Sequence, residues 1–264
     1  VTGNAFALAP GRTQAGKSIL AVNPHADYGG PFQWCEAHLI FGRMNVYGAA
    51  LAGVPVILQG HNDRLGWALT PNNPDIGDVY YVSRSAASIP ANQFNVPRDT
   101  PDLSWANFVL LNTRTMYVRS ERGLQAQSVD CLPADMGPVI ASHEGKMAAW
   151  RVGGYWNLGG VYQLMAMGAA QSLGEFQSAL ALRQLPCFHV VYADARGNIM
   201  YLYNATVGYK TFAVPDNPVR PKITPAQEWL APLDGGNPAT AWGAIIPMAR
   251  LPRSVNPEVG YVQA

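Results

Sequence analysis

Short apolar runs interrupted by glycine and proline dominate the hydrophobic pattern of the chain. Residues 45–50, 54–59 and 65–70 are apolar runs separated by glycines, which predicts three consecutive antiparallel strands. Residues 5–9 and 18–22 predict two further strands joined by a glycine-containing turn. Short strands with many turn residues between them are typical of a β-rich α+β fold.

The clearest helical signal is the sequence Ser-Leu-Gly-Glu at residues 172–175. A serine followed three residues later by glutamate is a capping box, and apolar side chains come next at Phe176, Leu180 and Leu182. We therefore predict a helix that begins after this serine. Residues 188–203 predict a hairpin of two strands around a polar turn.

The composition excludes several classes of protein. The chain has 264 residues, of which 48% are hydrophobic and 13% are charged, so it can bury a large core in one domain or two. A formal net charge of +1 without a basic run argues against nucleic-acid binding. The longest apolar stretches, such as residues 49–58, are too short and too interrupted by glycine to span a membrane.

The three cysteines do not define a site. Cys35, Cys131 and Cys187 lack the spacing of metal ligands, and an odd number of cysteines cannot pair fully within one chain. Cysteine usage therefore leaves the cellular compartment open.

The first twenty-five residues carry the most specific motif of the chain. Asn4-Ala5-Phe6 precedes a glycine-rich turn with Arg12 and Thr13, and Asn23-Pro24-His25 follows about ten residues later. This order and spacing resemble the start of the β subunit of the penicillin amidase family, a group of N-terminal nucleophile acylases. The family includes penicillin, cephalosporin and acyl-homoserine-lactone acylases.

Later motifs in the family order extend the resemblance over the whole chain. They are Gly60-His61-Asn62 followed by Trp67, Gly137-Pro138-Val139, residues 194–198, and residues 256–263. The resemblance implies that residues 1–264 form one β-subunit domain with part of the four-layer αββα sandwich of N-terminal nucleophile hydrolases. Family members continue beyond the position of Ala264 and also have an α subunit. We therefore expect the chain to represent the first half of a β subunit.

The position of the catalytic nucleophile holds Gly3, or a serine has been lost between Gly3 and Asn4. In the family this residue is a serine whose free α-amine, with an ordinary pKa of about 7.7 to 8.0, acts as its base. Glycine has no hydroxyl, and Val1 and Thr2 would block the amine. We expect that this chain does not hydrolyse anything by the family mechanism.

Two further positions match the catalytic machinery of the family. His25 follows Asn-Pro at the family spacing, where the resemblance implies that it orients the nucleophile's amine or the bound amide. Pro71 stands where family members offer a backbone N–H to the oxyanion, a donor that proline lacks. Unless Asn72 donates instead, half of the oxyanion hole is missing, and the family's other donor lies beyond Ala264.

The resemblance places substrate-binding positions at Ala26, Phe32 and Leu58. Ala26 is small where several relatives carry a large aromatic side chain, so we expect a pocket open to long or bulky acyl groups. We interpret His61 and Asn62, in contrast, as residues that stabilise a turn.

Asp75, Gly77 and Asp78 match part of the family's calcium site, with two carboxylates and one backbone carbonyl. A calcium ion takes about six to eight oxygen ligands, so this segment supplies only a part of such a site. The alternative is a solvated loop that leads into a strand at residues 78–82, because not every family member keeps the ion. We expect no required cofactor, and at most a structural calcium ion.

The resemblance implies hydrolysis of a linear amide, which releases a carboxylic acid from an N-acyl small molecule such as a β-lactam, an acyl-homoserine lactone or a lipopeptide. Working forms of the family are heterodimers of α and β subunits, made by self-cleavage of a periplasmic or secreted precursor. One alternative is a binding protein that keeps the acyl pocket without a nucleophile. Another is a fragment or a serine-replaced form of an active acylase.

Overall fold

The computed structural model describes residues 2–25, 29–30, 32–83, 112–131, 138–143, 146–155, 157–210, 231–235, 240 and 242–264. The chain forms two compact units. The first unit comprises Val1–Asp75, Asn157–Thr206 and Ile246–Ala264, and the second comprises Ile76–Trp156 and Val207–Ile245. The assignment of residues 1–264 to one family domain stays a prediction.

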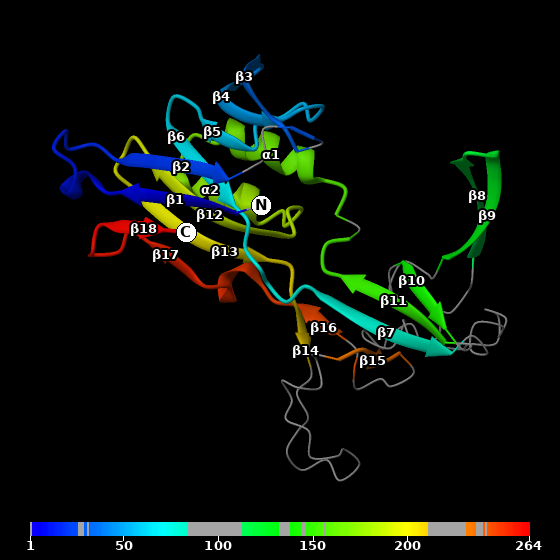
Figure 1. The fold of residues 1–264 in the computed structure, drawn as a ribbon. Coiled ribbons are helices and arrows are strands. Elements are labelled where there is room, and N and C mark those ends of the chain that lie inside the picture. The colour runs from blue at the N-terminus through cyan, green and yellow to red at the C-terminus, as the bar shows by residue number, and fades with distance from the viewer. Residues whose placement is uncertain are drawn as a thin grey trace, which may run out of the picture. The chain divides into compact units, whose positions relative to one another are not determined.

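A seven-stranded antiparallel sheet forms the centre of the first unit (Figure 1). The strands predicted at residues 45–50 and 65–70 belong to it, as does the hairpin predicted at residues 188–203. In their order across the sheet the strands are β17 (Arg253–Val255), β13 (Ile199–Ala205), β12 (Cys187–Asp194), β6 (Leu65–Thr70), β5 (Gln59–His61), β4 (Met44–Leu51) and β3 (Trp34–Phe41).

A second, three-stranded sheet of the first unit contains the N-terminal motif. Its strands are β18 (Tyr261–Gln263), β1 (Thr2–Leu8) and β2 (Ile19–His25), with β1 in the middle. A short 3-10 helix, η1 (Pro10–Arg12), begins the turn between β1 and β2. The Thr13 hydroxyl closes that turn, because it donates to the Lys17 carbonyl at 2.7 Å and accepts from the Lys17 N–H at 3.1 Å. The two strands predicted around this turn are confirmed.

Two helices lie in the first unit, α1 (Gly160–Ala169) and α2 (Leu173–Leu180). The predicted capping box begins α2, because the Ser172 hydroxyl accepts from the Glu175 N–H at 3.3 Å. A capping box predicts that the Glu175 carboxylate accepts from the N–H of Ser172. It accepts instead from the N–H of Gln171, one residue earlier, at 2.9 Å. The sequence did not predict α1, which begins at a glycine without a side-chain cap. A second 3-10 helix, η6, covers Met248–Arg250.

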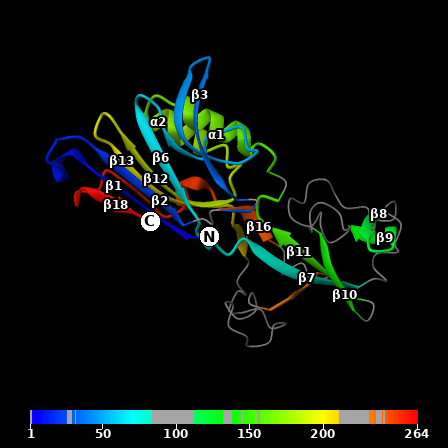
Figure 2. The ribbon, with the colours of Figure 1, turned by 45° about the horizontal axis from the view of Figure 1, so that its top comes forward.

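These elements form three layers in the first unit (Figures 1 and 2). The helices pack on one face of the seven-stranded sheet over a core of large side chains that includes Trp67, Phe176 and Tyr192. The three-stranded sheet packs on the other face over a core of small side chains, among them Ala5 and Ala68. Within the described residues, no helix has the length and apolar character needed to cross a membrane.

The second unit contains smaller sheets. Four strands pair in the order β10 (Val139–His143), β11 (Lys146–Val152), β7 (Gly77–Ser83) and β15 (Leu233–Asp234), and only β15 is parallel to its neighbour. β14 (Gly208–Lys210) pairs with β16 (Trp242–Ile245), and β8 (Asn112–Ser120) pairs with β9 (Gly123–Cys131).

The strand predicted at residues 54–59 is wrong, because only Gln59 lies in a strand, β5. Pro55 has no N–H for a ladder, and Val56 and Ile57 are both buried in the core, so this segment is not an alternating strand. The polar, proline-rich residues 83–102 predict a loop and residues 108–111 predict a strand, but residues 84–111 lie outside the described part of the chain, so both stay predictions.

Candidate active site

The N-terminal motif comes together through the pairing of β1 with β2. Gly3 lies opposite Pro24 in this ladder, and Thr2 lies opposite His25. The nucleophile position and the Asn-Pro-His motif, about twenty residues apart in sequence, are therefore neighbours in space.

Gly3 also faces the end of β6 across the gap between the two sheets. A Cβ atom at residue 3 would lie 3.4 Å from Cγ2 of Thr70 and 3.3 Å from the carbonyl oxygen of Asn23. Thr70 is the last residue of β6, and the exposed Pro71 follows it directly. The structure thus brings the predicted nucleophile position next to the segment of the predicted oxyanion position.

Buried polar atoms without partners gather at this end of the central strands. Within the described part of the chain, Thr70 Oγ1, Asn72 Oδ1 and Thr206 Oγ1 have no hydrogen-bond partner, although their residues are only 1%, 8% and 7% exposed. Thr70 pairs with His189 near the start of β12, and Cys187 at that start pairs with Ala205 at the end of β13. Asn72 follows β6 and Thr206 follows β13, so all three residues lie at one end of these strands. Because buried polar groups normally have partners, this end is suited to polar groups of a ligand or to water.

His189 belongs to the same end, and the sequence did not identify it as a site residue. It lies directly opposite Thr70, so the two side chains share one face of the sheet. Nδ1 of His189 is 3.0 Å from the hydroxyl of Tyr201, and its ring meets Tyr203 edge-on with 5.3 Å between ring centroids. Burial lowers the pKa of His189 and raises the pKa of Tyr201, which favours the neutral form of both groups. A polar residue near the start of an otherwise largely apolar strand was the available signal.

The other predicted site residues lie in different surroundings. His25 is exposed, with Nε2 3.3 Å from Nδ2 of Asn23, and Phe32 is 61% exposed in the segment before β3. Leu58 packs in the helix-side core, on the opposite face of the sheet from Gly3. Ala26 lies outside the described residues. The substrate contacts of Ala26, Phe32 and Leu58 stay predictions.

The two carboxylates of the predicted calcium site lie in different surroundings. Asp75 is exposed, whereas Asp78 is only 5% exposed near the start of β7. Lys210 Nζ lies 3.0 Å from each carboxylate oxygen of Asp78, and the indole N–H of Trp242 donates to Oδ2. Within the described ranges, no cluster of three or more His, Cys, Asp or Glu side chains could hold a metal ion. These groups therefore do not fit calcium, because the Asp78 carboxylate is already paired with the Lys210 ammonium.

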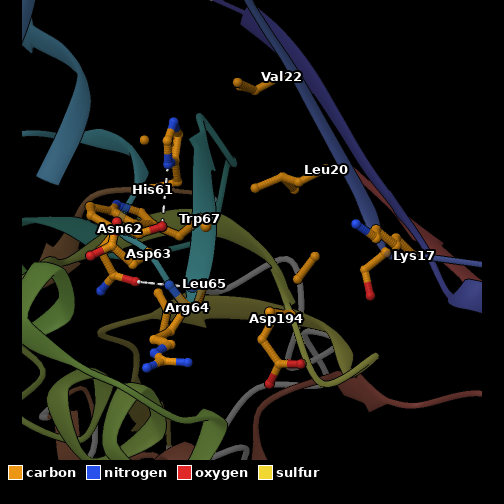
Figure 3. Close-up of a pocket in the computed structure, with 15 residues that line it drawn as sticks. Lys17, Leu20, Val22, His61, Asn62, Asp63, Arg64, Leu65, Trp67 and Asp194 are labelled. Atoms are coloured by element: carbon orange, nitrogen blue, oxygen red, sulfur yellow. Dashed lines mark hydrogen bonds between the residues drawn. The ribbon is translucent and has the colours of Figure 1, made fainter. Parts of the chain in front are cut away.

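A pocket of about 590 Å³ lies elsewhere in the first unit, between β2 and the turn that joins β5 to β6 (Figure 3). Leu20 and Val22 line it from β2, and neither Gly3 nor His25 reaches it. Asn62 beside it is structural: its Nδ2 donates to the carbonyls at the end of α1, and its Oδ1 accepts from two turn N–H groups. The prediction that Asn62 stabilises a turn is confirmed, and the pocket holds no catalytic group that the sequence predicted.

Comparison with known proteins decides the family. The model of the penicillin amidase family matches residues 2–264. The chain belongs to the penicillin amidase family. The predicted resemblance over the whole chain is therefore confirmed.

Curated relatives are acylases. The chain is 26% identical over 266 residues to the penicillin acylase 2 proenzyme of a Pseudomonas species, which covers 98% of this chain and 31% of that protein. It is 26% identical over 213 residues to the acyl-homoserine lactone acylase PvdQ of Pseudomonas savastanoi pv. phaseolicola, which covers 75% of this chain and 26% of the relative. The chain thus spans less than a third of the length of these two relatives.

A solved relative supports the fold. A thermostable penicillin G acylase from Alcaligenes faecalis superposes with a TM-score of 0.72 at 19% identity, covering 99% of this chain and 43% of the other. The predicted α+β class agrees with this neighbour and with the sheet-rich first unit.

Proposed function

We propose that this chain is part of the β subunit of an N-acyl amide hydrolase whose site lies at Gly3, His25 and the Thr70-Pro71 segment. The observation that carries the proposal is the meeting of Gly3 with Thr70 at the end of the strands where three buried polar atoms lack partners. An acyl amide brings a carbonyl and an N–H, which are the groups that such atoms bind. The acylase names of the curated relatives support the same class of reaction.

Gly3 restricts the reaction that this chain can carry out at the proposed site. Glycine offers no hydroxyl, so a chain with Gly3 forms no acyl-enzyme at this position. Pro71 supplies no N–H to an oxyanion, and the loss of one such donor costs about 3 kcal/mol of transition-state stabilisation. These two residues favour a second candidate, a non-catalytic homologue that binds acyl ligands at the same site.

In this proposal, the chain works together with the layers and the subunit that complete the family's assembly. A further helical layer on the outer face of the three-stranded sheet would complete the four-layer αββα sandwich. The partner would be an α subunit from the same precursor, in a periplasmic or secreted protein. A proenzyme among the relatives supports a processed precursor. The substrate would be a small N-acyl molecule such as a β-lactam, an acyl-homoserine lactone or a lipopeptide.

The test restores the hydroxyl in the full-length precursor through Gly3→Ser, with Gly3→Ala as the matched control. Both variants add a Cβ that lies 3.3 Å from the Asn23 carbonyl, so the neighbouring strand must move by a few tenths of an ångström in each. We expect only the serine variant to cleave itself before residue 3, as read by intact mass, and to release acid from N-acyl amides. Acylase activity of the unchanged Gly3 protein above a blank would contradict the proposal.

A second step examines the oxyanion position. If Gly3→Ser cleaves itself but hydrolyses amides slowly, Pro71→Ala added to it should raise kcat by about a hundredfold, the usual effect of one oxyanion donor. Full activity with Pro71 unchanged would show that another donor serves the site. Binding of acyl amides by the Gly3 protein without turnover, measured by calorimetry, would support the non-catalytic homologue.

A further inference from the structure

A buried carboxylate of the second unit, that of Asp78, is paired with a lysine side chain of the same unit. The Asp78 residue is 5% exposed and lies at the second position of β7. Its two carboxylate oxygens are each 3.0 Å from Lys210 Nζ, and both side chains of the pair are almost fully buried. A charge removed from water is tolerated only when it is paired and hydrogen-bonded, and this pair meets both conditions.

The second donor to Asp78 comes from the residue paired with Lys210. Lys210 and Trp242 are register partners in the ladder of β14 with β16. The indole N–H of Trp242 donates to Asp78 Oδ2, while the ammonium contacts both oxygens. One two-stranded sheet therefore delivers both donors to a carboxylate more than 130 residues away in sequence.

The surroundings of the carboxylate are already positive. Besides Lys210, the guanidinium carbon of Arg151 lies 5.0 Å from the ring centroid of Trp242, and Lys210 Nζ lies 5.8 Å from the same centroid. The neighbouring Tyr80 donates its hydroxyl to the Thr240 carbonyl at 2.8 Å. A divalent cation would have to displace the ammonium and approach a second cationic side chain.

We propose that Lys210 is the built-in counter-ion of Asp78 and that it holds the second unit together without calcium. The Asp-x-Gly-Asp segment resembles part of a calcium site, but the ammonium and the indole N–H take the oxygens that an ion would need. Calcium requires about six to eight oxygen ligands. Of the carboxylates in this segment, one is paired with lysine and Asp75 is exposed.

The first test measures calcium directly on the 264-residue chain. Equilibrium dialysis with about 1 mM calcium chloride, a concentration that fills weak extracellular sites, should find no stoichiometric calcium. The melting temperature should be the same with calcium and with a chelator. Stoichiometric binding that Asp78→Asn abolishes would overturn the proposal.

The second test removes the internal cation. Lys210→Met should lower the melting temperature by roughly 10 °C, because it leaves a buried carboxylate without its counter-ion. Lys17→Met, the same change at an exposed lysine of the first unit, should leave it within about 1 °C. The double variant Asp78→Asn/Lys210→Met removes both charges and should recover at least half of the loss.

Two outcomes would contradict the role of Lys210. One is a Lys210→Met variant that melts like Lys17→Met. The other is a double variant whose losses are simply the sum of the two single losses, since independent residues add and paired residues do not. If Lys210→Met does not fold, the double variant and the dialysis of the unchanged chain still decide the question.

Discussion

The two faces of the seven-stranded sheet are packed with side chains of very different size. On the helix side, Trp67, Phe176 and Tyr192 are each 0% exposed, and the rings of Phe176 and Tyr192 lie 4.9 Å apart between centroids. On the side of the three-stranded sheet, the corresponding core is made largely of alanine, with Ala7 and Ala68 also at 0%. Both faces contain fully buried side chains, but the two cores are built from side chains of different size.

The difference in side-chain size bears on the position of the proposed site. Small side chains on this face leave space for side chains of the facing sheet, and the Leu20 side chain of β2 packs on Gly66 of β6, where a Cβ would lie 3.1 Å from Leu20 Cδ2. At the end of the same face, the Thr70 side chain lies beside Gly3, 3.4 Å from where a Cβ would be. The large-residue face stabilises the sheet, whereas the small-residue face positions Gly3, the proposed nucleophile position on β1.

The largest effect should come from the helix side. Phe176→Ala should lower the free energy of unfolding by about 3–5 kcal/mol, because it opens a cavity among Trp67, Tyr192 and the helices. Phe32→Ala makes the same change at a side chain that is 61% exposed and should cost less than about 1 kcal/mol. Urea titrations compare the two. Equal losses would show that the helix-side core does not carry the stability that its burial indicates.

A smaller effect should come from overfilling the inter-sheet side. Ala68→Leu should cost about 1–3 kcal/mol, since the added atoms have no room between the two sheets. Ala126→Leu is the matched control, because Ala126 is exposed on β9. In a Gly3→Ser precursor, Ala68→Leu should also slow self-cleavage by displacing β1. Unchanged stability and cleavage would refute close packing of this face.

The smallest effect concerns His189 and pH. Burial lowers its folded pKa below the unfolded value of about 6.5, so the unfolded chain binds more protons just below that pH. The contribution of His189 to stability is therefore complete above about pH 6.5 and decreases as the pH falls toward the folded pKa. Urea titrations at several pH values should show a shallower decrease for His189→Gln than for the unchanged chain. The exposed His38, changed to glutamine, serves as control, and parallel curves for all three proteins would refute the role of His189.

Local features were predictable from the sequence because neighbouring residues decide them. The capping box of α2 needs only Ser172 and Glu175, three residues apart. The turn between β12 and β13 needs only Asp194, whose carboxylate accepts from the N–H groups of Arg196 and Asn198 at 2.9 Å. α1 has no such signal, since Gly159 and Gly160 begin it and no side chain caps it.

The sequence alone determined the family, the order of its motifs, the β1–β2 hairpin and the glycine at the predicted nucleophile position, since each depends on a short stretch of residues. Only the tertiary structure decided that Gly3 faces Thr70, that His189 and Tyr201 share this end, and that Lys210 takes the carboxylate of Asp78. These contacts join segments far apart in the chain. A contact between distant segments depends on how sheets pack and on register, and it leaves no periodic pattern in the sequence from which it could be predicted.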